Sequence, residues 1–491
     1  MEDLSVTPRS IEPQTSPPPP PLTQTSPSSS SSSSMGVKRI RVVEGSCWSC
    51  RKRRIKCDLA KPRCERCCRV GATCEYAARP IRWCTKPTAA APARFQVVPS
   101  AVDQLAAPLG AREKRALTYF AGRFWPLLTT TPDPCALPMV LVLEHRVLLL
   151  TACLVADTHR VLQDGRNSRK GPQLKRLECL SAVRSQLNED CSSSGDEVPW
   201  TGLLLAVLLL YFHDGYLECA EKSASTASHH AGANAIIERL GGVEVVLDTG
   251  PEALHLLVSE FASTDLTTAM LNGGRPSFSP QMWDKIDRRS VWWSRDPNAR
   301  FLSLATVLGC ISSMVHYLDD VNSGLVTHSD ERVREFEMAL TPTYAGFSTL
   351  SCGVYTGPED EDLEAVHAYA LTRSFQHAGL IYLYRAICGL PMDHWLVQQH
   401  VLPCLDCILN VKRPSKVVNC ALFPLLVAGT HVQSARHQRE IVNVLNLLHD
   451  RMKFASVQSV SAVLNDIWNS DPGNMAWFEM FTGLGTDAAV L

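Results

Sequence analysis

Six cysteines between residues 47 and 74 constrain this chain more than any other feature of its sequence. They divide into two triplets with the same C-x2-C-x6-C spacing, Cys47, Cys50 and Cys57 followed by Cys64, Cys67 and Cys74. Zinc prefers thiolate ligands, and structural zinc takes four ligands in a tetrahedron. Six thiolates therefore fill two zinc sites only if two sulfurs each bridge both ions. The duplicated spacing predicts a small zinc-binding cysteine cluster, in which two sulfurs must be shared if it holds two Zn²⁺ ions.

The other cysteines and the apolar segments indicate the compartment. The chain has 19 cysteines, and its first residues lack the apolar core of a signal peptide. The longest apolar run, residues 203–212, has about half the length needed to cross a bilayer. In a reducing compartment, patterned cysteines bind metal more often than they form disulfides. We expect a soluble, intracellular protein that is not bound to a membrane.

Charge is distributed unevenly along the chain. The net charge is −1, but residues 38–86 hold 15 Lys or Arg against 4 acidic residues, a local charge of +11. The rest of the chain therefore carries −12. A compact basic head on an acidic body is typical of a nucleic-acid-binding protein.

The segment CWSCRKRRIKCDLAKPRCERCCRVGATC resembles the fungal Zn2Cys6 binuclear cluster of transcription factors. The resemblance implies that Cys47 and Cys64 bridge the two zinc ions. Cys50 and Cys57 would then complete one site, and Cys67 and Cys74 the other. Pro62 falls where the family has a loop proline between the halves, whereas Cys68 and Cys84 lie outside the repeat.

Between Cys50 and Cys57 lies the run RKRRIK, five positive charges in six residues. Such density on a short helix is self-repelling unless an anion such as phosphate faces it. The resemblance implies that this helix enters the major groove of double-stranded DNA and reads a CGG-like triplet. Arg53 and Arg54 fall at its base-reading positions; the family more often has Lys in place of Arg54, but arginine also pairs with guanine. The predicted DNA-binding set is Arg51, Lys52, Arg53, Arg54, Lys56 and Arg63, with Lys52, Lys56 and Arg63 assigned to phosphates.

Composition divides the chain into four segments. Residues 1–34 hold 8 prolines and 11 serines and are predicted to be a disordered tail. Residues 35–84 form the predicted DNA-binding domain, and residues 85–110, rich in Ala and Pro, form a linker without a coiled-coil heptad repeat. Residues 111–491 form the predicted regulatory domain.

Helical periodicity dominates this last segment. Apolar residues between Leu117 and Leu128 recur at helical spacing, with Pro126 expected to end or kink the helix. Similar stripes recur at residues 140–156, 201–212, 229–240, 301–318, 363–388, 397–411, 441–454 and 460–468. They predict one large all-α domain. Residues 229–242, 378–391, 423–429 and 467–485 resemble parts of the fungal-specific transcription factor domain.

Several features of the body have two interpretations. His229 and His230 share a helix with apolar residues and are predicted to be structural, and the Cys404–Cys407 pair to be buried or idle thiols. Gly241 and Gly242 are predicted to stop a helix. The acidic run 359–362 is predicted to be a solvated loop or helix start. The aromatic residues after residue 454 would either contact a coactivator or dock into the core.

These features predict a nuclear, sequence-specific transcription factor of RNA polymerase II genes. Family habit suggests a pathway-specific activator of a secondary-metabolite gene cluster; repression, or control of primary metabolism, is the alternative. An enzyme is not expected, because the chain lacks a phosphate-binding glycine loop, HExxH and G-x-S-x-G. A zinc adaptor protein is a remote alternative. Without a coiled coil, we expect binding as a monomer to one triplet, or as a homodimer joined through the helical body.

Overall fold

The computed structural model divides the chain into two compact units, residues 1–80 and residues 81–491. The residues described are 46–53, 55–74, 76, 109–130, 135–165, 170–190, 198–221, 224–288, 302–342, 363–411, 415–470, 475–485 and 487–491. Over these residues every regular element is a helix, which confirms the predicted cysteine cluster followed by a large all-α domain. The predicted tail and nearly all of the predicted linker lie outside the described residues.

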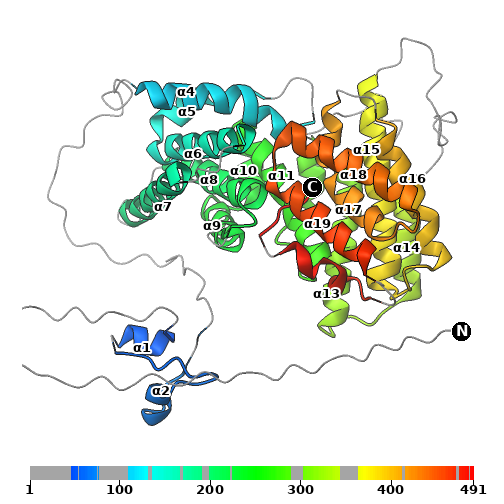
Figure 1. Cartoon of the computed structure of the whole chain (residues 1–491), viewed down its shortest axis with the longest axis horizontal. Helices are drawn as coiled ribbons and strands as arrows, with labels where there is room; N and C mark the ends of the chain where they lie inside the picture. Colours follow the sequence, from blue (N-terminus) through cyan, green and yellow to red (C-terminus); the bar gives the residue numbers. More distant parts are fainter. Residues whose placement is uncertain are drawn as a thin grey trace, which may run out of the picture. The chain divides into compact units, whose positions relative to one another are not determined.

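The small unit contains two five-residue helices, α1 (Trp48–Lys52) and α2 (Glu65–Arg69) (Figure 1). Each helix starts directly after the first cysteine of its triplet and contains the second. Helices this short are not stable alone in water. The buried cysteines, which form the hydrophobic cluster of this unit, must therefore hold the helices in place.

The first part of the helical unit is built around α6 and α8 (Figure 1). α4, α5, α7 and α8 pack on α6, and α9 packs on α8. The bounds are α4 (Ala111–Tyr119), η1 (Phe120–Phe124), η2 (Trp125–Leu128), α5 (Met139–Glu144), α6 (Arg146–Gln163), α7 (Lys170–Asp190), α8 (Val198–Phe212), η3 (His213–Leu217), α9 (Thr226–Arg239) and α10 (Val243–Thr249).

The second part is a layered bundle in which α15 contacts α13, α14, α16 and α17. α11 contacts α8 of the first part and α13 of the second, and so joins the two. The bounds are α11 (Glu252–Asn272), α12 (Met282–Arg288), α13 (Leu304–Asn322), α14 (Asp330–Leu340), α15 (Leu363–Tyr382), η4 (Leu383–Ile387), α16 (Trp395–Leu409), η5 (Lys416–Cys420), α17 (Leu422–Thr430), α18 (Ala435–Met452), α19 (Ala455–Asn469) and η6 (Phe478–Leu484).

One continuous hydrophobic core runs through both parts of the helical unit. α8 contributes a long, almost fully apolar stretch to this core. The stretch Trp200–Leu217 is long and apolar enough to cross a membrane by length and composition, but 89% of it is buried inside the unit. It therefore packs here as a core helix.

Two long helices end in a π turn that contains a buried charged residue. α8 continues into η3, which contains Asp214, and α15 continues into η4, which contains Arg385. π turns inside helices are rare and often occur at functional sites. Asp214 accepts hydrogen bonds from Nε and Nη2 of Arg176 on α7, whereas Arg385 has no such ion pair among the described residues.

The last described residues, 487–491, are threaded between helices that are distant in sequence. Asp487 accepts hydrogen bonds from the backbone and side chain of Thr226, and the Val490 carbonyl accepts one from Thr267. The amide of Ala489 donates to Gly215, and Ala489, Val490 and Leu491 are buried. This segment therefore ties α9, η3 and α11 together.

Each predicted apolar stripe overlaps one or more helices of the structure, but some bounds differ, and α10, α12 and α14 were not predicted. The helix expected over Leu117–Leu128 changes at Phe120 into a π turn and then a 3-10 turn that contains Pro126 near its start. Residues 140–156 were predicted as one helix, but the structure breaks them at His145 into α5 and α6. Gly241 and Gly242 stop α9 with φ angles of 96° and 97°, as predicted. α7 and α11 carried no such stripe and were not predicted.

Candidate zinc centre and DNA-binding surface

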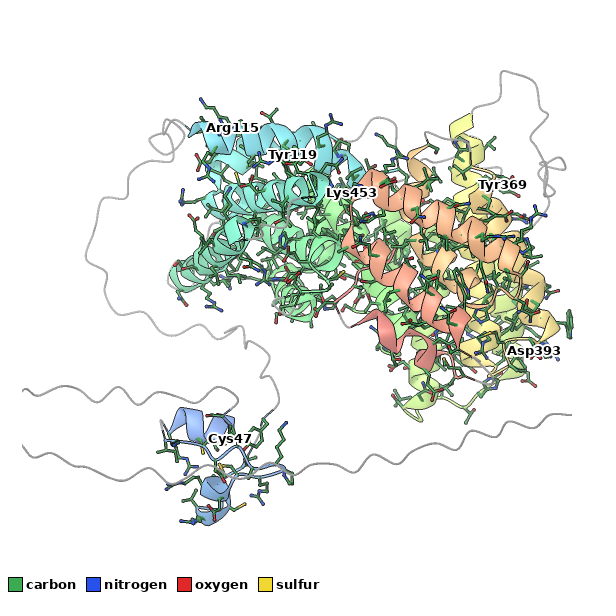
Figure 2. The ribbon with its side chains drawn as sticks, in the orientation of Figure 1. Cys47, Arg115, Tyr119, Tyr369, Asp393 and Lys453 are labelled. Carbon is green, nitrogen blue, oxygen red and sulfur yellow. The ribbon has the colours of Figure 1, made fainter. Side chains whose placement is uncertain are left out.

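The structure gathers the six cysteine sulfurs into two groups of four. Cys50 and Cys57 belong to one group, Cys67 and Cys74 belong to the other, and Cys47 and Cys64 belong to both. Within each group all Sγ atoms lie within 4.8 Å of one another. Figure 2 labels Cys47 in the small unit. The geometry therefore matches the sharing of two sulfurs that the ligand count demands.

The spacing of the sulfurs fits zinc. A tetrahedral site with Zn–S bonds of about 2.3 Å has S–S edges of about 3.8 Å. The Sγ of Cys47 lies 3.6 Å from that of Cys64 and 3.6 Å from that of Cys67, and the Sγ of Cys50 lies 3.6 Å from that of Cys64. The pair Cys47–Cys64 belongs to both groups, and each of the other two pairs belongs to one. These three distances are close to the edge of a zinc–thiolate tetrahedron, and the Sγ atoms of Cys50 and Cys67, which belong to different groups, lie 3.9 Å apart, so the six sulfurs form one compact cluster that fits zinc.

Burial makes the need for a cation clear. Five of the six cysteines are buried, and Cys74 is partly exposed. Burial raises the pKa of the Cys47 thiol and raises that of Cys50 to about 12, because a buried thiolate loses its hydration. Despite the opposing effect of burial, hydrogen bonds instead lower the pKa of Cys57, Cys64 and Cys74. A bound zinc ion reverses the effect of burial, since a coordinating thiol is deprotonated.

Local hydrogen bonds place the cysteines of the second triplet. The Sγ of Cys64 caps α2 and lies 3.4 Å from the amide of Cys67, which donates to it. The amide of Cys64 in turn donates to the Sγ of Cys74 over 3.2 Å. The two halves are joined by the Ser49 hydroxyl, which donates to the carbonyl of Thr73 over 2.7 Å.

Tyr76 is a residue of this centre that the sequence analysis missed. Its hydroxyl donates to the carbonyl of Ala60 over 3.0 Å and lies 3.5 Å from the Sγ of Cys57. A hydrogen-bonding side chain next to a metal-binding group fixes its orientation. No spacing rule marks Tyr76; its position two residues after Cys74 was the only available signal.

The two halves of the cluster differ sharply in charge. The six residues that follow the second cysteine are RKRRIK at 51–56 in the first half and CRVGAT at 68–73 in the second. The first run has five positive charges and the second has one. The first half therefore carries the surface suited to the DNA backbone, although the spacing of the two halves is identical.

The predicted DNA-binding residues fall into three groups. Lys52, Lys56 and Arg63 are exposed. Arg53 is also exposed, but its Nη2 lies 3.4 Å from the Sγ of Cys67 and its Nε donates to the Ser49 carbonyl. Arg54 and the side chain of Arg51 lie outside the described residues.

Comparison with protein families agrees with this geometry. Residues 45–84 match the fungal Zn(2)-Cys(6) binuclear cluster domain. Residues 115–490, more than half of the chain, match the fungal specific transcription factor domain. The chain belongs to the fungal Zn2Cys6 transcription factors. Neither a curated protein nor a solved structure matches it. The family establishes a zinc-binding, DNA-binding transcription factor, and both matched domains are transcription factor domains rather than enzyme domains.

The histidines of α9 in this transcription factor have structural partners. His229 Nε2 lies 3.2 Å from a carboxylate oxygen of Asp214, and His230 Nε2 lies 2.6 Å from one of Asp265. Ser277 Oγ lies 3.3 Å from the same nitrogen of His230. A Ser-His-Asp catalytic relay needs the serine and the carboxylate on opposite ring nitrogens. This cluster therefore holds α9 against α11 and lacks the geometry of that relay.

The aromatic residues near the C-terminus of this transcription factor dock into the core. Trp477, Met480 and Phe481 are buried, and the Trp477 indole donates to the carbonyl of Met270 over 2.7 Å. Of the two interpretations of this segment, docking is correct for these three residues. Cys404 is buried, as predicted. The acidic run 359–362 lies outside the described residues.

Proposed function

We propose that this transcription factor reads a CGG-type triplet in double-stranded DNA through α1 and the basic residues that follow it. The observation that carries the proposal is the charge difference between two halves of equal spacing. Only the first half presents a dense row of cations, and Lys52 and Lys56 of that row are exposed. The positive charges of this row complement the negative charges of the phosphates that flank a major groove.

Two Zn²⁺ ions support this surface in the proposal. Cys47 and Cys64 would be ligands of both ions, Cys50 and Cys57 would complete one site, and Cys67 and Cys74 would complete the other. The Sγ groups and their distances support this assignment. When bound, the zinc ions supply no chemistry beyond fixing the six thiolates, and α1 and α2 are held through them.

The basic residues divide into two roles. Arg53 and Arg54 read base edges, where an arginine that forks onto guanine O6 and N7 contributes about 1–3 kcal/mol of discrimination. Lys52, Lys56 and Arg63 contact phosphates and position the helix, and Arg51 belongs to the same DNA-binding set. The contact of Arg53 with Cys67 supports a further role for Arg53, since a cation beside a thiolate also stabilises the cluster.

A gel-shift titration with the zinc-loaded full chain tests the proposal. The probes are a duplex with one CGG triplet and a scrambled duplex of equal composition, each with and without a zinc chelator. Arg54→Ala should reduce the preference for CGG, whereas Lys56→Ala should weaken binding to both probes and lower the salt dependence by about one counterion. Arg436→Ala, which removes an exposed charge from the helical unit, is the control. Equal affinity of the unsubstituted chain for both probes would refute sequence-specific reading.

At the level of the cell, we propose a nuclear activator of one secondary-metabolite gene cluster, with coactivators as partners. The support is the layout of a zinc cluster followed by a helical regulatory domain. Expression profiling of a deletion strain tests it: genes of one biosynthetic cluster should fall. A rise in those genes would indicate a repressor, and a change in central metabolism would refute the pathway assignment.

Residues 85–110 lack the heptad repeat of a coiled coil, and this supports a proposal about the oligomeric state. We propose binding as a monomer to one triplet, or as a homodimer joined through the helical unit. Probes with two triplets at varied spacing separate the two states. A sharp optimum in spacing would exclude the monomer.

A further inference from the structure

We propose that the helical unit binds a small organic monocarboxylate in a cavity at η4, with Arg385 as the anchor for the carboxylate. The inference goes beyond DNA reading and does not depend on it, because the cavity lies entirely in the helical unit. Four observations carry it: an uncompensated buried charge, a free donor, a cavity of ligand size and an acidic residue at its edge.

Arg385 is a buried cation that has no acidic partner among the described residues. Among the described residues of the helical unit, Arg176 and Arg385 are the two buried arginines, with exposed fractions of 9% and 6%. Arg176 is neutralised by Asp214, with Nη2 only 2.6 Å from the carboxylate. The hydrogen-bond partners of Arg385 are a histidine ring, two backbone carbonyls and a thioether sulfur, none of which carries a negative charge. Burying a charge is costly unless an opposite charge accompanies it.

The hydrogen bonds of Arg385 use four of its five N–H donors and leave one without a partner among the described residues. Its Nε donates to Nε2 of His431, one Nη1 hydrogen goes to the Leu390 carbonyl, and the Nη2 group donates to the Met475 carbonyl and faces the Met480 sulfur. A guanidinium has five N–H donors. One N–H on Nη1 therefore has no partner in the described part of the chain. A carboxylate is the group that supplies both the missing acceptor and the missing charge.

Arg385 lines a cavity of about 610 Å³. Organic ligands occupy pockets of roughly 300–1,000 Å³ that combine apolar walls with a few placed polar groups. The apolar wall here consists of Ala386, Pro391, Met475, Trp477 and Phe478. A volume of this size accommodates far more than an inorganic anion. The ligand is therefore an organic acid with an apolar body.

Asp393 limits the charge of that ligand. It lines the same cavity and is exposed, and Figure 2 labels it at one end of the helical unit. A second negative charge on the ligand would be repelled by this carboxylate, whereas an N–H or O–H group would find an acceptor in it. This favours a monocarboxylate over a dicarboxylate or a phosphate.

The position of Arg385 also suggests how a bound ligand would affect the helical unit. Through Leu390 and Met475 it holds the segments that follow η4 and precede η6. A carboxylate on its free N–H would add a further contact to the same guanidinium. Ligand binding would then stabilise the packing of these two segments, and with it the helical unit.

Isothermal titration calorimetry with the zinc-loaded full chain tests the proposal, with 4-phenylbutyrate as the probe and its uncharged amide as the matched compound. The carboxylate should bind at least tenfold more tightly than the amide. No heat from the acid at millimolar concentration, or equal affinity for acid and amide, would overturn the proposal. Phenylsuccinate, a dicarboxylate probe, should bind more weakly than 4-phenylbutyrate.

Three variants locate the site. Ala386→Phe fills the cavity without removing any hydrogen bond of Arg385 and should abolish binding while the far-UV circular dichroism stays unchanged. Arg385→Gln should also abolish binding, but it removes structural hydrogen bonds, so Ala386→Phe is the decisive variant. Asp393→Asn should tighten binding several-fold. Arg436→Gln, which removes an exposed guanidinium elsewhere, should bind normally. Unchanged binding by folded Ala386→Phe would refute this location, whatever the gel-shift experiment shows.

Discussion

Replacing Asp214 with asparagine tests how much the buried ion pair between Asp214 and Arg176 contributes to the stability of the helical unit. The Asp214 carboxylate is fully buried. It accepts hydrogen bonds from Arg176 Nε and Nη2 over 3.3 and 2.6 Å and from the amide of Ser225 over 2.9 Å. His213 Nδ1 and His229 Nε2 lie 2.9 and 3.2 Å from it. Asp214→Asn keeps the shape of the side chain but removes its charge, so that Arg176 is left buried and uncompensated.

The surface of the same unit offers a matched pair. Asp320 Oδ1 lies 2.6 Å from Arg275 Nη1, the same separation as between Asp214 and Arg176, but both side chains of that pair are partly exposed. Breaking a buried pair by removing one partner costs about 3–5 kcal/mol, whereas an exposed pair contributes about 0–1 kcal/mol. We therefore expect Asp214→Asn to lower the free energy of unfolding by about 3 kcal/mol more than Asp320→Asn. That difference is roughly a hundredfold in the unfolding equilibrium.

Urea unfolding followed by circular dichroism at several pH values measures this difference. Hydrogen bonds from the neighbouring histidines and Arg176 hold the pKa of Asp214 below its usual range, despite the opposing effect of burial. A depressed pKa means that the contribution of Asp214 is complete above its unfolded pKa, about 3.9, and is lost as the pH falls below that value. The gap between the unsubstituted chain and Asp214→Asn should therefore narrow below about pH 4. Equal effects of the two substitutions at pH 7 would refute the reasoning.

Three other predictions concern the zinc cluster and helix packing. Because Cys64 belongs to both sulfur groups and Cys57 to one, Cys64→Ala should remove both zinc ions whereas Cys57→Ala removes fewer, as counted by native mass spectrometry. Tyr76→Phe removes the hydroxyl beside Cys57 and should lower zinc affinity by about 10–100-fold in a chelator competition. A Cβ at Gly202 would lie 2.4 Å from the His145 ring, so Gly202→Ala should lower the free energy of unfolding by about 1–3 kcal/mol in urea titrations.

Matched substitutions keep these predictions falsifiable. Cys68 is exposed and belongs to neither sulfur group, so Cys68→Ala should keep the full zinc count; loss of zinc from that variant would contradict the assignment. A Cβ added at Gly171 on α7 would meet open space, and Gly171→Ala should be neutral or slightly stabilising. If Gly202→Ala were equally harmless, the close approach of His145 to α8 would be wrong.

The sequence predicts best where ligand chemistry leaves few alternatives. Six thiolates can hold two zinc ions only if two of them are shared, the family resemblance assigned that role to Cys47 and Cys64, and the structure has both in both sulfur groups. Amphipathic stripes predicted helices such as α6 and α18, because one face of each packs against the core and the other faces water.

Two kinds of feature escaped that reasoning. α11 is buried along nearly its whole length, so it has no polar face to create a period, and α7 has apolar residues on several sides. The second kind is the contact between distant residues. Nothing near Arg385 in the sequence marks its bond to Met475, 90 residues away, or the position of Tyr76 beside Cys57. Such contacts depend on tertiary packing and have no local pattern.

The segment 487–491 has a consequence for how the protein is made. Its hydrogen bonds reach Thr226 and Thr267, partners 261 and 223 residues earlier in the chain. Synthesis proceeds from the N-terminus, so α9 and α11 leave the ribosome long before these partners exist. Until then the space between α9, η3 and α11 that residues 487–491 occupy stays empty, and apolar side chains of α11 lie beside it. We therefore expect a chain cut short before Asp487 to expose apolar surface that this segment otherwise covers, and to be removed by cellular proteases faster than the full chain.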